Sequence, residues 1–235
     1  MLANEPAALA IRAKTTSMPI VLTGAFDPVR AGLAQSLGRP GMNVTGSTQL
    51  MDQLTAKHFE FLRQIFPRLK RVGQLVDTTS TGCRLIEEYA LRSAQQLGIV
   101  FMPYVVANQN EVERAFSLMK TQKERPEALL PCPSSVLFSL RALLFESAVR
   151  LRIPFTSYVV TKLPLGVLFS YAATIDEGFY RAARYVDKIL KGASPGDLPI
   201  EQPSRFQFII NIKTAKALGL TIPPSLLARA DQVIE

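Results

Sequence analysis

Three short segments of the 235-residue chain are rich in hydroxyl groups, and each follows an apolar run. They read Asp77-Thr78-Thr79-Ser80-Thr81, Pro131-Cys132-Pro133-Ser134-Ser135 and Thr156-Ser157-Tyr158. Hydroxyls and the free amides at a helix start can hold a small polar group such as a carboxylate by hydrogen bonds. None of the three segments contains the acid–base pair or the activated nucleophile that a reaction needs. The pattern therefore favours a binding site over a catalytic one.

The elements that position these segments alternate between two periodicities. Short apolar runs predict strands at 71–76, 100–106, 128–131 and 153–158, and the stretches between them have the spacing of amphipathic helices. Further strands are predicted at 18–23, 166–171 and 206–212, and helices near 6–14, 27–37, 52–66, after Ser80, after Ser134 or Ser135, from 174 to 192, and close to the end of the chain. Such an order builds parallel α/β sheets flanked by helices, with any ligand at the carboxyl ends of the strands.

Two helix starts have specific signals. Asp27 followed by Pro28 predicts an N-cap and first turn for a helix that runs to Leu37. Thr174 with Glu177 three residues later predicts a capping box. The sole histidine, His58, shares an apolar helix face with phenylalanine and leucine, which favours a packed histidine over a catalytic base.

Composition excludes several classes of protein. The net charge of +8 is scattered, without a basic stripe or a reading helix, so we expect no nucleic-acid partner. No apolar stretch approaches the roughly 20 residues that span a bilayer. Two cysteines and one histidine make neither a disulfide framework nor a zinc site, and we expect no metal or other cofactor.

Three segments carry a family resemblance: Asp27-Pro28-Val29 with 39–46, the stretches 185–192 and 197–203, and the long run 211–231. They resemble the substrate-binding proteins of ATP-binding-cassette (ABC) importers, in the family that includes the tryptophan-type binding proteins. The resemblance implies a two-lobed type-I periplasmic-binding fold with three crossovers. Lobe one would comprise 1–48 and 166–203, and lobe two 49–165 and 204–235. The lobes would close on a ligand by hinge motion near Leu50, Leu165 and Pro203.

The resemblance also implies partners and a location. It predicts a non-enzymatic protein that binds an amino acid or small organic acid, works with a membrane permease, and is periplasmic or membrane-anchored outside the cytoplasm. The N-terminal residues have neither the basic start nor the apolar core of a signal peptide. They are typical of the turn and helix after a strand, so we expect lobe one to be incomplete, with an open sheet edge through which two copies could dimerise.

Ligand contacts are expected at the strand ends of both lobes. In lobe one the candidates are Asn4, Glu5, Thr23 and Asp27. In lobe two they are Thr78, Thr79, Ser80, Ser134, Ser135 and Tyr158. For each of them a plain helix-cap or turn role is the competing interpretation.

Two alternatives remain open at this point. A cofactor-independent racemase would use Cys83 and Cys132 as a pair of thiols, but it needs one thiol from each lobe, and both fall in lobe two; small buried apolar residues are the simpler interpretation. The ligand-sensing module of a regulator has the same fold, although no DNA-binding helix pair is attached.

Overall fold

The computed structural model describes residues 2–3, 5–159 and 163–235, and the chain divides into two compact units. Unit 1 is formed by Met1–Met51 and Ala173–Phe206, and unit 2 by Asp52–Ala172 and Gln207–Glu235. At each of the three crossings the division lies a few residues later in the chain than the lobe boundaries expected from the sequence.

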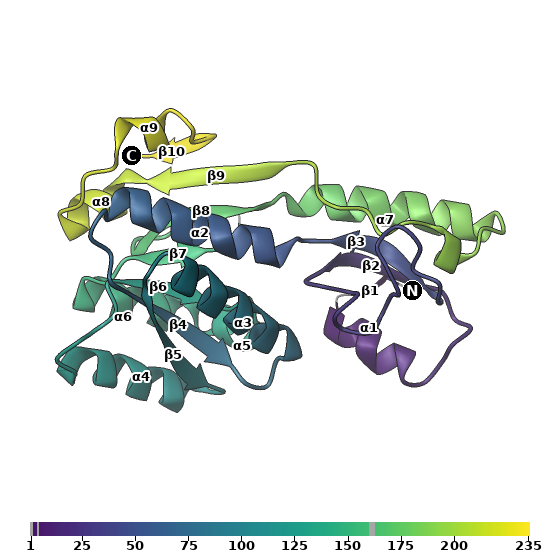
Figure 1. The fold of residues 1–235 in the computed structure, drawn as a ribbon, viewed down its shortest axis with the longest axis horizontal. Coiled ribbons are helices and arrows are strands. Elements are labelled where there is room, and N and C mark those ends of the chain that lie inside the picture. Colours follow the sequence, from purple (N-terminus) through teal and green to yellow (C-terminus); the bar gives the residue numbers. More distant parts are fainter. Residues whose placement is uncertain (1, 4, 160–162) are drawn as a thin grey trace. The chain divides into compact units, whose positions relative to one another are not determined.

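Unit 1 is built on a three-stranded parallel sheet in the order β1-β2-β3. Its strands are β1 (Leu2–Ala3), β2 (Ile20–Ala25) and β3 (Val44–Thr48), and its helices are α1 (Glu5–Arg12), α7 (Ile175–Leu190) and the short 3-10 helix η1 (Pro195–Asp197). Ile20 and Leu22 pack with Ala8 of α1, whereas Val21 packs with Ala182 and Tyr185 of α7. Because neighbouring strand residues point to opposite faces, α1 and α7 cover opposite sides of this sheet (Figure 1).

The helix predicted at 27–37 is wrong. Its start signal works, since Asp27 Oδ1 accepts a hydrogen bond from Arg30 N at 3.0 Å and Asp27 O accepts one from Ala31 N at 2.9 Å. The helical turn then ends at Gly32, whose φ of 72° is left-handed. The segment continues as turns, with Gln35 N bonded to Pro40 O.

Unit 2 contains a seven-stranded sheet in the order β10-β9-β8-β7-β6-β4-β5. The strands are β4 (Arg71–Asp77), β5 (Val100–Val106), β6 (Ala128–Pro131), β7 (Phe155–Ser157), β8 (Val167–Ala173), β9 (Phe206–Asn211) and β10 (Gln232–Ile234). β4 pairs in parallel with β5 and β6, and β6–β7, β7–β8 and β9–β10 are parallel too. The four strands predicted between 71 and 158 are confirmed. The pairing of β8 with β7 places residues 167–172 in unit 2, whereas the sequence assigned them to lobe one.

Helices flank this sheet on both faces. They are α2 (Met51–Ile65), α3 (Thr81–Gln96), α4 (Gln109–Thr121), α5 (Ser135–Ser139), α6 (Arg141–Leu151), α8 (Ile212–Leu218) and α9 (Pro224–Leu227). In β7, Phe155 meets Phe145 of α6, and its neighbour Thr156 meets His58 of α2, so α2 and α6 lie on opposite faces. The single helix predicted after Ser134 is divided in two at Leu140.

The predicted packed histidine anchors α2 to the sheet. His58 is fully buried, its Nε2 donates to Tyr171 O at 2.9 Å, and its Nδ1 lies 3.0 Å from Thr156 Oγ1, which donates to it. Burial lowers the pKa of His58 to about 4, and the bond to the Tyr171 carbonyl offsets only part of that change. The neutral imidazole is therefore a structural link between α2, β7 and β8.

Candidate functional site

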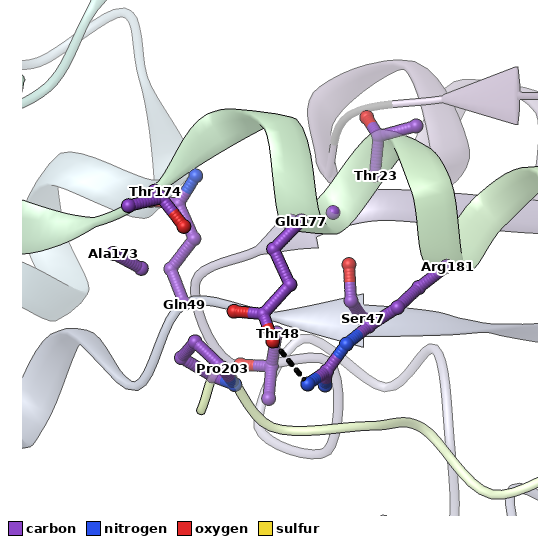
Figure 2. Close-up of a pocket in the computed structure, with 11 residues that line it drawn as sticks. Thr23, Ser47, Thr48, Gln49, Ala173, Thr174, Glu177, Arg181 and Pro203 are labelled. Atoms are coloured by element: carbon purple, nitrogen blue, oxygen red, sulfur yellow. Dashed lines mark hydrogen bonds and ion pairs between the residues drawn. The ribbon is translucent and has the colours of Figure 1, made fainter. Parts of the chain in front are cut away.

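A pocket that is partly open to solvent lies at the carboxyl ends of β2 and β3 in unit 1. Thr23 and Gly24 contribute from β2, and Ser47 to Gln49 from the end of β3. The opposite wall comes from the start of α7 and the chain beside it (Figure 2). Its residues are Ala173, Thr174, Glu177, Gly178, Arg181 and Pro203. This is the position that parallel-sheet topology predicts for a ligand site.

The pocket depends on a close approach of α7 to β2. A Cβ at Gly178 would lie 2.8 Å from Thr23 O, so a larger residue would push the helix off the strand. Gly46 permits a similar approach between strands, because a Cβ there would lie 2.2 Å from Leu22 O, and its φ of 126° is left-handed. Glycine at these two positions lets the strand ends and α7 enclose the pocket.

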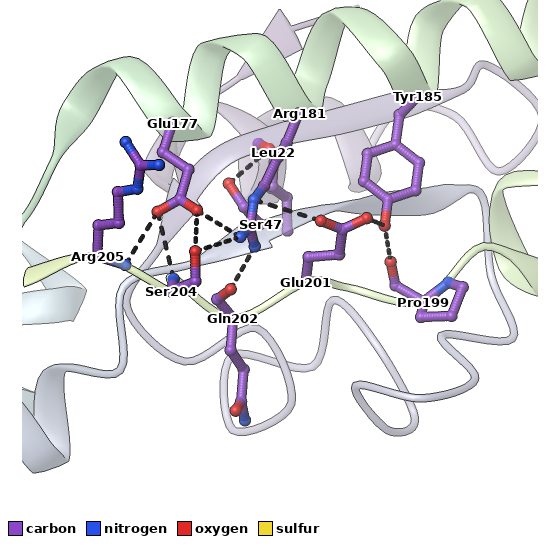
Figure 3. A network of polar contacts seen from close by, with 10 residues as sticks. All are labelled: Leu22, Ser47, Glu177, Arg181, Tyr185, Pro199, Glu201, Gln202, Ser204 and Arg205. Atoms are coloured by element: carbon purple, nitrogen blue, oxygen red, sulfur yellow. Dashed lines mark hydrogen bonds and ion pairs between the residues drawn. The ribbon is translucent and has the colours of Figure 1, made fainter.

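A network of charged groups holds segment 199–205 against α7 (Figure 3). Glu177 accepts hydrogen bonds from the Ser204 hydroxyl, from Ser204 N at 3.2 Å, and from Arg205 N at 3.3 Å. Arg181 Nη2 lies 2.5 Å from Glu177 Oε1, its Nε lies 3.3 Å from Glu201 Oε2, and its Nη1 donates to Gln202 O. The network thereby fixes the chain on either side of Pro203, which lines the pocket.

The protonation of this network follows from its contacts. Desolvation opposes the charge of Glu177, but the Ser204 hydroxyl and amide and the Arg181 charge outweigh it and lower the pKa of Glu177. Burial, with the hydrogen bond from its hydroxyl to the Glu201 carboxylate at 2.8 Å, raises the pKa of Tyr185. The lowered pKa keeps Glu177 charged near pH 7, and the raised pKa keeps the Tyr185 hydroxyl neutral.

The capping box predicted at Thr174 is wrong, because Glu177 has other partners. Thr174 is the N-cap residue of α7, but its side chain makes no capping hydrogen bond. The Glu177 carboxylate, which would have to reach back to the cap, is bonded to Ser204 and Arg205 instead. Thr174 N donates to Arg205 O at 3.3 Å.

The candidates in unit 1 differ in what they do. Thr23 lines the pocket. Glu5 is 4% exposed, and its Oε2 accepts hydrogen bonds from Phe26 N at 2.8 Å and Asp27 N at 3.0 Å. Burial raises the pKa of Glu5, and the two backbone amides act against that shift. Glu5 therefore holds α1 against the turn that presents Asp27. Asn4 lies outside the described residues.

The loop after β4 in unit 2 is shaped by Asp77. This carboxylate is 1% exposed, and its Oδ1 accepts hydrogen bonds from Thr79 N at 2.9 Å and Thr79 Oγ1 at 2.6 Å. Thr78 N donates to Val106 O at 3.4 Å. Ser80 is the N-cap residue of α3, but its side chain makes no capping bond. The loop thus carries two hydroxyls, those of Thr78 and Ser80, that are not needed to shape it.

The loop after β6 carries the second group of candidates. Ser134 caps α5, since its Oγ accepts a hydrogen bond from Leu137 N at 3.0 Å. Ser135 is exposed in the first turn of that helix. The two strand-end loops lie side by side, because β4 and β6 are neighbours and their pairing runs to Leu75 and Pro131.

Cys83 and Cys132 form a disulfide, contrary to their interpretation as unpaired apolar residues. Their Cα atoms are 5.4 Å apart across 49 residues of sequence, and both residues are buried. The bond lies within unit 2, so the pair offers no thiol for proton transfer from two sides of a substrate. The racemase alternative loses the feature that suggested it.

Tyr158 is packed rather than presented to a ligand. It is 9% exposed, its hydroxyl donates to Thr55 Oγ1 at 3.1 Å, and its ring centroid lies 4.2 Å from that of His58. Burial raises the pKa of Tyr158. The structure therefore places 78–80 and 134–135 after neighbouring strands, whereas the Tyr158 phenol lies in the interior of unit 2.

Several pocket residues were missed by sequence reasoning. They are Ser47, Gln49, Thr174, Glu177 and Arg181. The available signal was the segment Val44–Thr48, a hydroxyl-rich strand end like those of unit 2, which was not predicted as a strand. Its polar side chains are nevertheless buried, with Thr45 Oγ1 donating to Leu198 O at 2.7 Å.

The two parallel α/β units have the type-I periplasmic-binding-like fold. A family model of the ABC transporter substrate binding proteins matches residues 3–234. The chain belongs to this family, which confirms the resemblance stated from the sequence. In the described part of the chain, no helix has the length and apolar character needed to cross a membrane.

Similar proteins include one curated relative and two solved structures. The chain is 25% identical over 221 residues to the tyrosine-binding protein of Clostridioides difficile (strain R20291). The aligned region covers 92% of this chain and 61% of the relative. The ABC domain in complex with L-Trp from Streptococcus pneumonia matches with a TM-score of 0.87 and 25% identity, over 99% of this chain and 77% of that one. A conserved domain protein from Vibrio cholerae O1 biovar El Tor matches with a TM-score of 0.87 and 26% identity, over 99% and 76% of the respective chains.

These findings confirm the predicted fold class and its mainly parallel sheets flanked by helices. The chain spans less than two thirds of the curated relative. That relative is a tyrosine-binding protein, and the substrate-binding proteins of ABC systems act outside the cytoplasm.

Proposed function

We propose that this chain is the solute-binding component of an ABC importer and that its solute is an amino acid, with L-tryptophan and L-tyrosine as the first candidates. The observation that carries the proposal is the family match over residues 3–234. The hydroxyl-rich strand ends in both units supply the groups that such a solute needs. The named solutes of the two relatives, tyrosine and L-Trp, narrow the choice to aromatic amino acids.

An amino acid presents one anionic and one cationic group to its binding protein. In unit 2, the hydroxyls of Thr78, Thr79, Ser80, Ser134 and Ser135 suit the carboxylate, together with the amides at the start of α3. In unit 1, Asp27 suits the ammonium, and Thr23 is a further polar candidate. Glu5 would act indirectly, since its carboxylate holds the Asp27 amide.

Further parts of the proposal concern the lobes, the partner and the location. The two units would act as the two lobes, joined by three connections that permit hinge motion. A membrane permease would receive the solute. The disulfide Cys83–Cys132 supports a location outside the cytoplasm, because disulfides persist in oxidising compartments and are rare in reducing ones. No catalytic step is part of this function.

A thermal-shift screen followed by calorimetry tests the proposal. The purified chain is heated with each of the common amino acids and with small carboxylates, and a bound solute at a hundred times its Kd adds about 2.7 kcal/mol to the free energy of unfolding. We expect stabilisation by an aromatic amino acid and recovery of that amino acid unchanged after long incubation. Conversion of the solute, or stabilisation by none of the compounds, would contradict the proposal.

An Asp27→Asn variant identifies the ammonium contact. Its Oδ1 can still accept the bond from Arg30 N, so the turn should persist while the charge is lost. We expect at least tenfold weaker binding of the amino acid, with less than twofold change for Asp197→Asn, which removes a carboxylate that is exposed beside Arg39 at 3.9 Å. Equal affinity of the two variants would remove Asp27 from the site.

A further inference from the structure

The disulfide occupies a particular place in unit 2, at the carboxyl ends of two neighbouring strands. Cys132 directly follows β6, and its amide donates to Leu75 O of β4 at 3.1 Å. Cys83 lies in the first turn of α3, and its amide donates to Ser80 O at 3.1 Å. The bond therefore joins the start of the helix after β4 to the loop after β6.

These two loops carry the hydroxyl groups of unit 2 that the proposed function uses. Thr78, Thr79 and Ser80 precede Cys83, and Ser134 and Ser135 follow Cys132. The register between β4 and β6 runs only to Leu75 and Pro131, so regular strand pairing stops before the hydroxyls begin. Beyond the paired residues, Asp77 N of the first loop donates a hydrogen bond to Cys132 Sγ of the second at 3.4 Å, and the acceptor is a sulfur atom of the disulfide.

Apart from the bond from Thr78 N to Val106 O, each loop is otherwise ordered by its own local bonds. Asp77 accepts two bonds from Thr79, and Ser134 accepts one from Leu137 N. These bonds fix the shape of each loop but not the distance between the loops. The disulfide fixes that distance, because its two Cα atoms are 5.4 Å apart and both residues are buried in a shared core cluster.

We propose that Cys83–Cys132 is a positioning element of the solute site, which holds the Thr78–Ser80 and Ser134–Ser135 hydroxyls at the spacing that a carboxylate requires. The inference rests on the proposed function and adds to it that the oxidised state of this pair sets affinity. The physical basis is preorganisation: a solute that meets prearranged donors does not have to order two loops on binding. Cys83 and Cys132 act through the loops and do not touch the solute.

Formation of the bond has a simple balance. The two thiols lose two protons and two electrons to a disulfide-bearing oxidant, which becomes a dithiol. Dithiothreitol reverses the step, since it restores both thiols and closes to its own cyclic disulfide. With Cys83 0% and Cys132 1% exposed, the formed bond is shielded from reductants in the folded state.

The test compares a variant without the bond to one that is destabilised elsewhere in the same core. Cys83→Ala/Cys132→Ala removes the crosslink and keeps small apolar side chains. Met119→Ala truncates a fully buried side chain in the last turn of α4, in the same core cluster and away from the two loops. The wild type, the double cysteine variant and Met119→Ala are all measured without dithiothreitol. For each protein, calorimetry gives the Kd for L-tryptophan and L-tyrosine, and thermal unfolding gives the Tm.

We expect Kd to rise at least tenfold in the double cysteine variant and less than twofold in Met119→Ala, although both lower the Tm. An unchanged Kd in the double variant would overturn the inference and leave the disulfide as a stabilising crosslink only. If the double variant does not fold, the wild-type chain is unfolded in urea with dithiothreitol and refolded in its presence. This reduced protein, with the added mass of two hydrogens verified, takes the variant's place under the same criteria.

Hydrogen exchange separates this inference from the proposed function. Amides of 78–80 and 135–137 should exchange at least tenfold faster without the bond, relative to those of 100–106, and Met119→Ala should not show this local change. If the wild type binds neither amino acid, the proposed solute is rejected. The exchange pattern alone then decides whether the disulfide positions the two loops. Uniformly faster exchange over unit 2 would overturn it.

Discussion

The strand ends of the two units are held in place by different chemistry. In unit 1, charged side chains on α7 and segment 199–205 fix the pocket wall, with Glu177, Arg181 and Glu201 all partly exposed. In unit 2, a disulfide and a fully buried histidine fix the loops and the sheet beside them. Charge networks weaken with salt and acid, whereas a disulfide and apolar packing respond to neither in the same way. Salt should therefore weaken unit 1 more than unit 2, whereas acid should act on both units through different groups.

The largest expected effect comes from breaking the sheet of unit 1. Gly46→Ala places a Cβ 2.2 Å from Leu22 O at a φ of 126°, which no rearrangement of side chains relieves. We expect the free energy of opening of unit 1 to fall by more than about 4 kcal/mol, a loss confined to severe packing or backbone defects. Hydrogen exchange of 20–25 against 71–77 measures it unit by unit.

Gly98→Ala is the matched control for backbone strain in unit 2. Its φ of 64° is also left-handed, but a Cβ there has no atom of the described residues within 4 Å. The expected cost is about 1 kcal/mol. Equal losses in the two variants would mean that the close approach of β2 and β3 is not what makes Gly46 necessary.

The second effect concerns acid and unit 2. The pKa of His58 is lowered from an ordinary value of 6.5 to about 4 in the folded protein, so its contribution to stability is present above pH 6.5 and is lost as the pH falls towards 4. The shift corresponds to about 3 kcal/mol, at 1.36 kcal/mol per pH unit. Urea unfolding of unit 2 between pH 7 and 4 should show this loss.

His58→Gln supplies the comparison for that experiment. Its amide can keep one of the two hydrogen bonds, to Thr156 or to the Tyr171 carbonyl, and it does not titrate. The variant should be less stable than the wild type at pH 7, and its stability should depend much less on pH between 6.5 and 4. Parallel pH profiles for the two proteins would show that His58 is not the titrating group.

The third effect concerns the charge network of unit 1. Arg181→Ala leaves Glu177 and Glu201 without their shared cation and should lower the stability of unit 1 by about 2 kcal/mol. Lys191→Ala removes an exposed ion pair with Asp187 on the same helix and should cost less than about 1 kcal/mol. Hydrogen exchange of the backbone amides in 199–205 measures the loss of stability in both variants.

The pH response of this network has a defined direction. The pKa of Glu177 is lowered in the folded state, so its contribution is present above its unfolded pKa and is lost as the pH falls through the folded one. The pKa of Glu5 is raised, so its contribution has the opposite direction and is lost as the pH rises. Salt should weaken the Arg181 contribution and leave the His58 contribution unchanged.

What the sequence predicted was local, and what it missed was tertiary. Apolar runs and hydroxyl-rich ends identified the strands of unit 2, because a buried parallel strand has a short continuous pattern. The strand at 44–48 was missed because three of its five residues are Thr or Ser and one is Gly46. The capping box at Thr174 failed because Ser204, 27 residues away in sequence, is a competing partner of Glu177.

The disulfide was missed for a different physical reason. Pairing of Cys83 with Cys132 requires that β4 lie beside β6, and strand order is not encoded in the spacing of either cysteine. The candidate site shows the same division. Thr23 was found from its place at a strand end, whereas Arg181 enters the pocket only because α7 returns to the sheet after a long excursion through unit 2.

The smallest effect tests whether Tyr158 belongs to the site or to the interior of unit 2. Tyr158→Phe removes the hydroxyl that donates to Thr55 and keeps the ring against His58. A lost buried hydrogen bond should cost about 1 kcal/mol of unfolding free energy. Since the phenol is turned towards α2, the Kd for an amino acid should change less than twofold.

Ser80→Ala is the contrasting variant. Because the Ser80 hydroxyl makes no capping bond, we expect stability to be kept and affinity to fall at least fivefold. Calorimetry beside urea unfolding separates the two outcomes, and a large rise in Kd for Tyr158→Phe would return this tyrosine to the solute site.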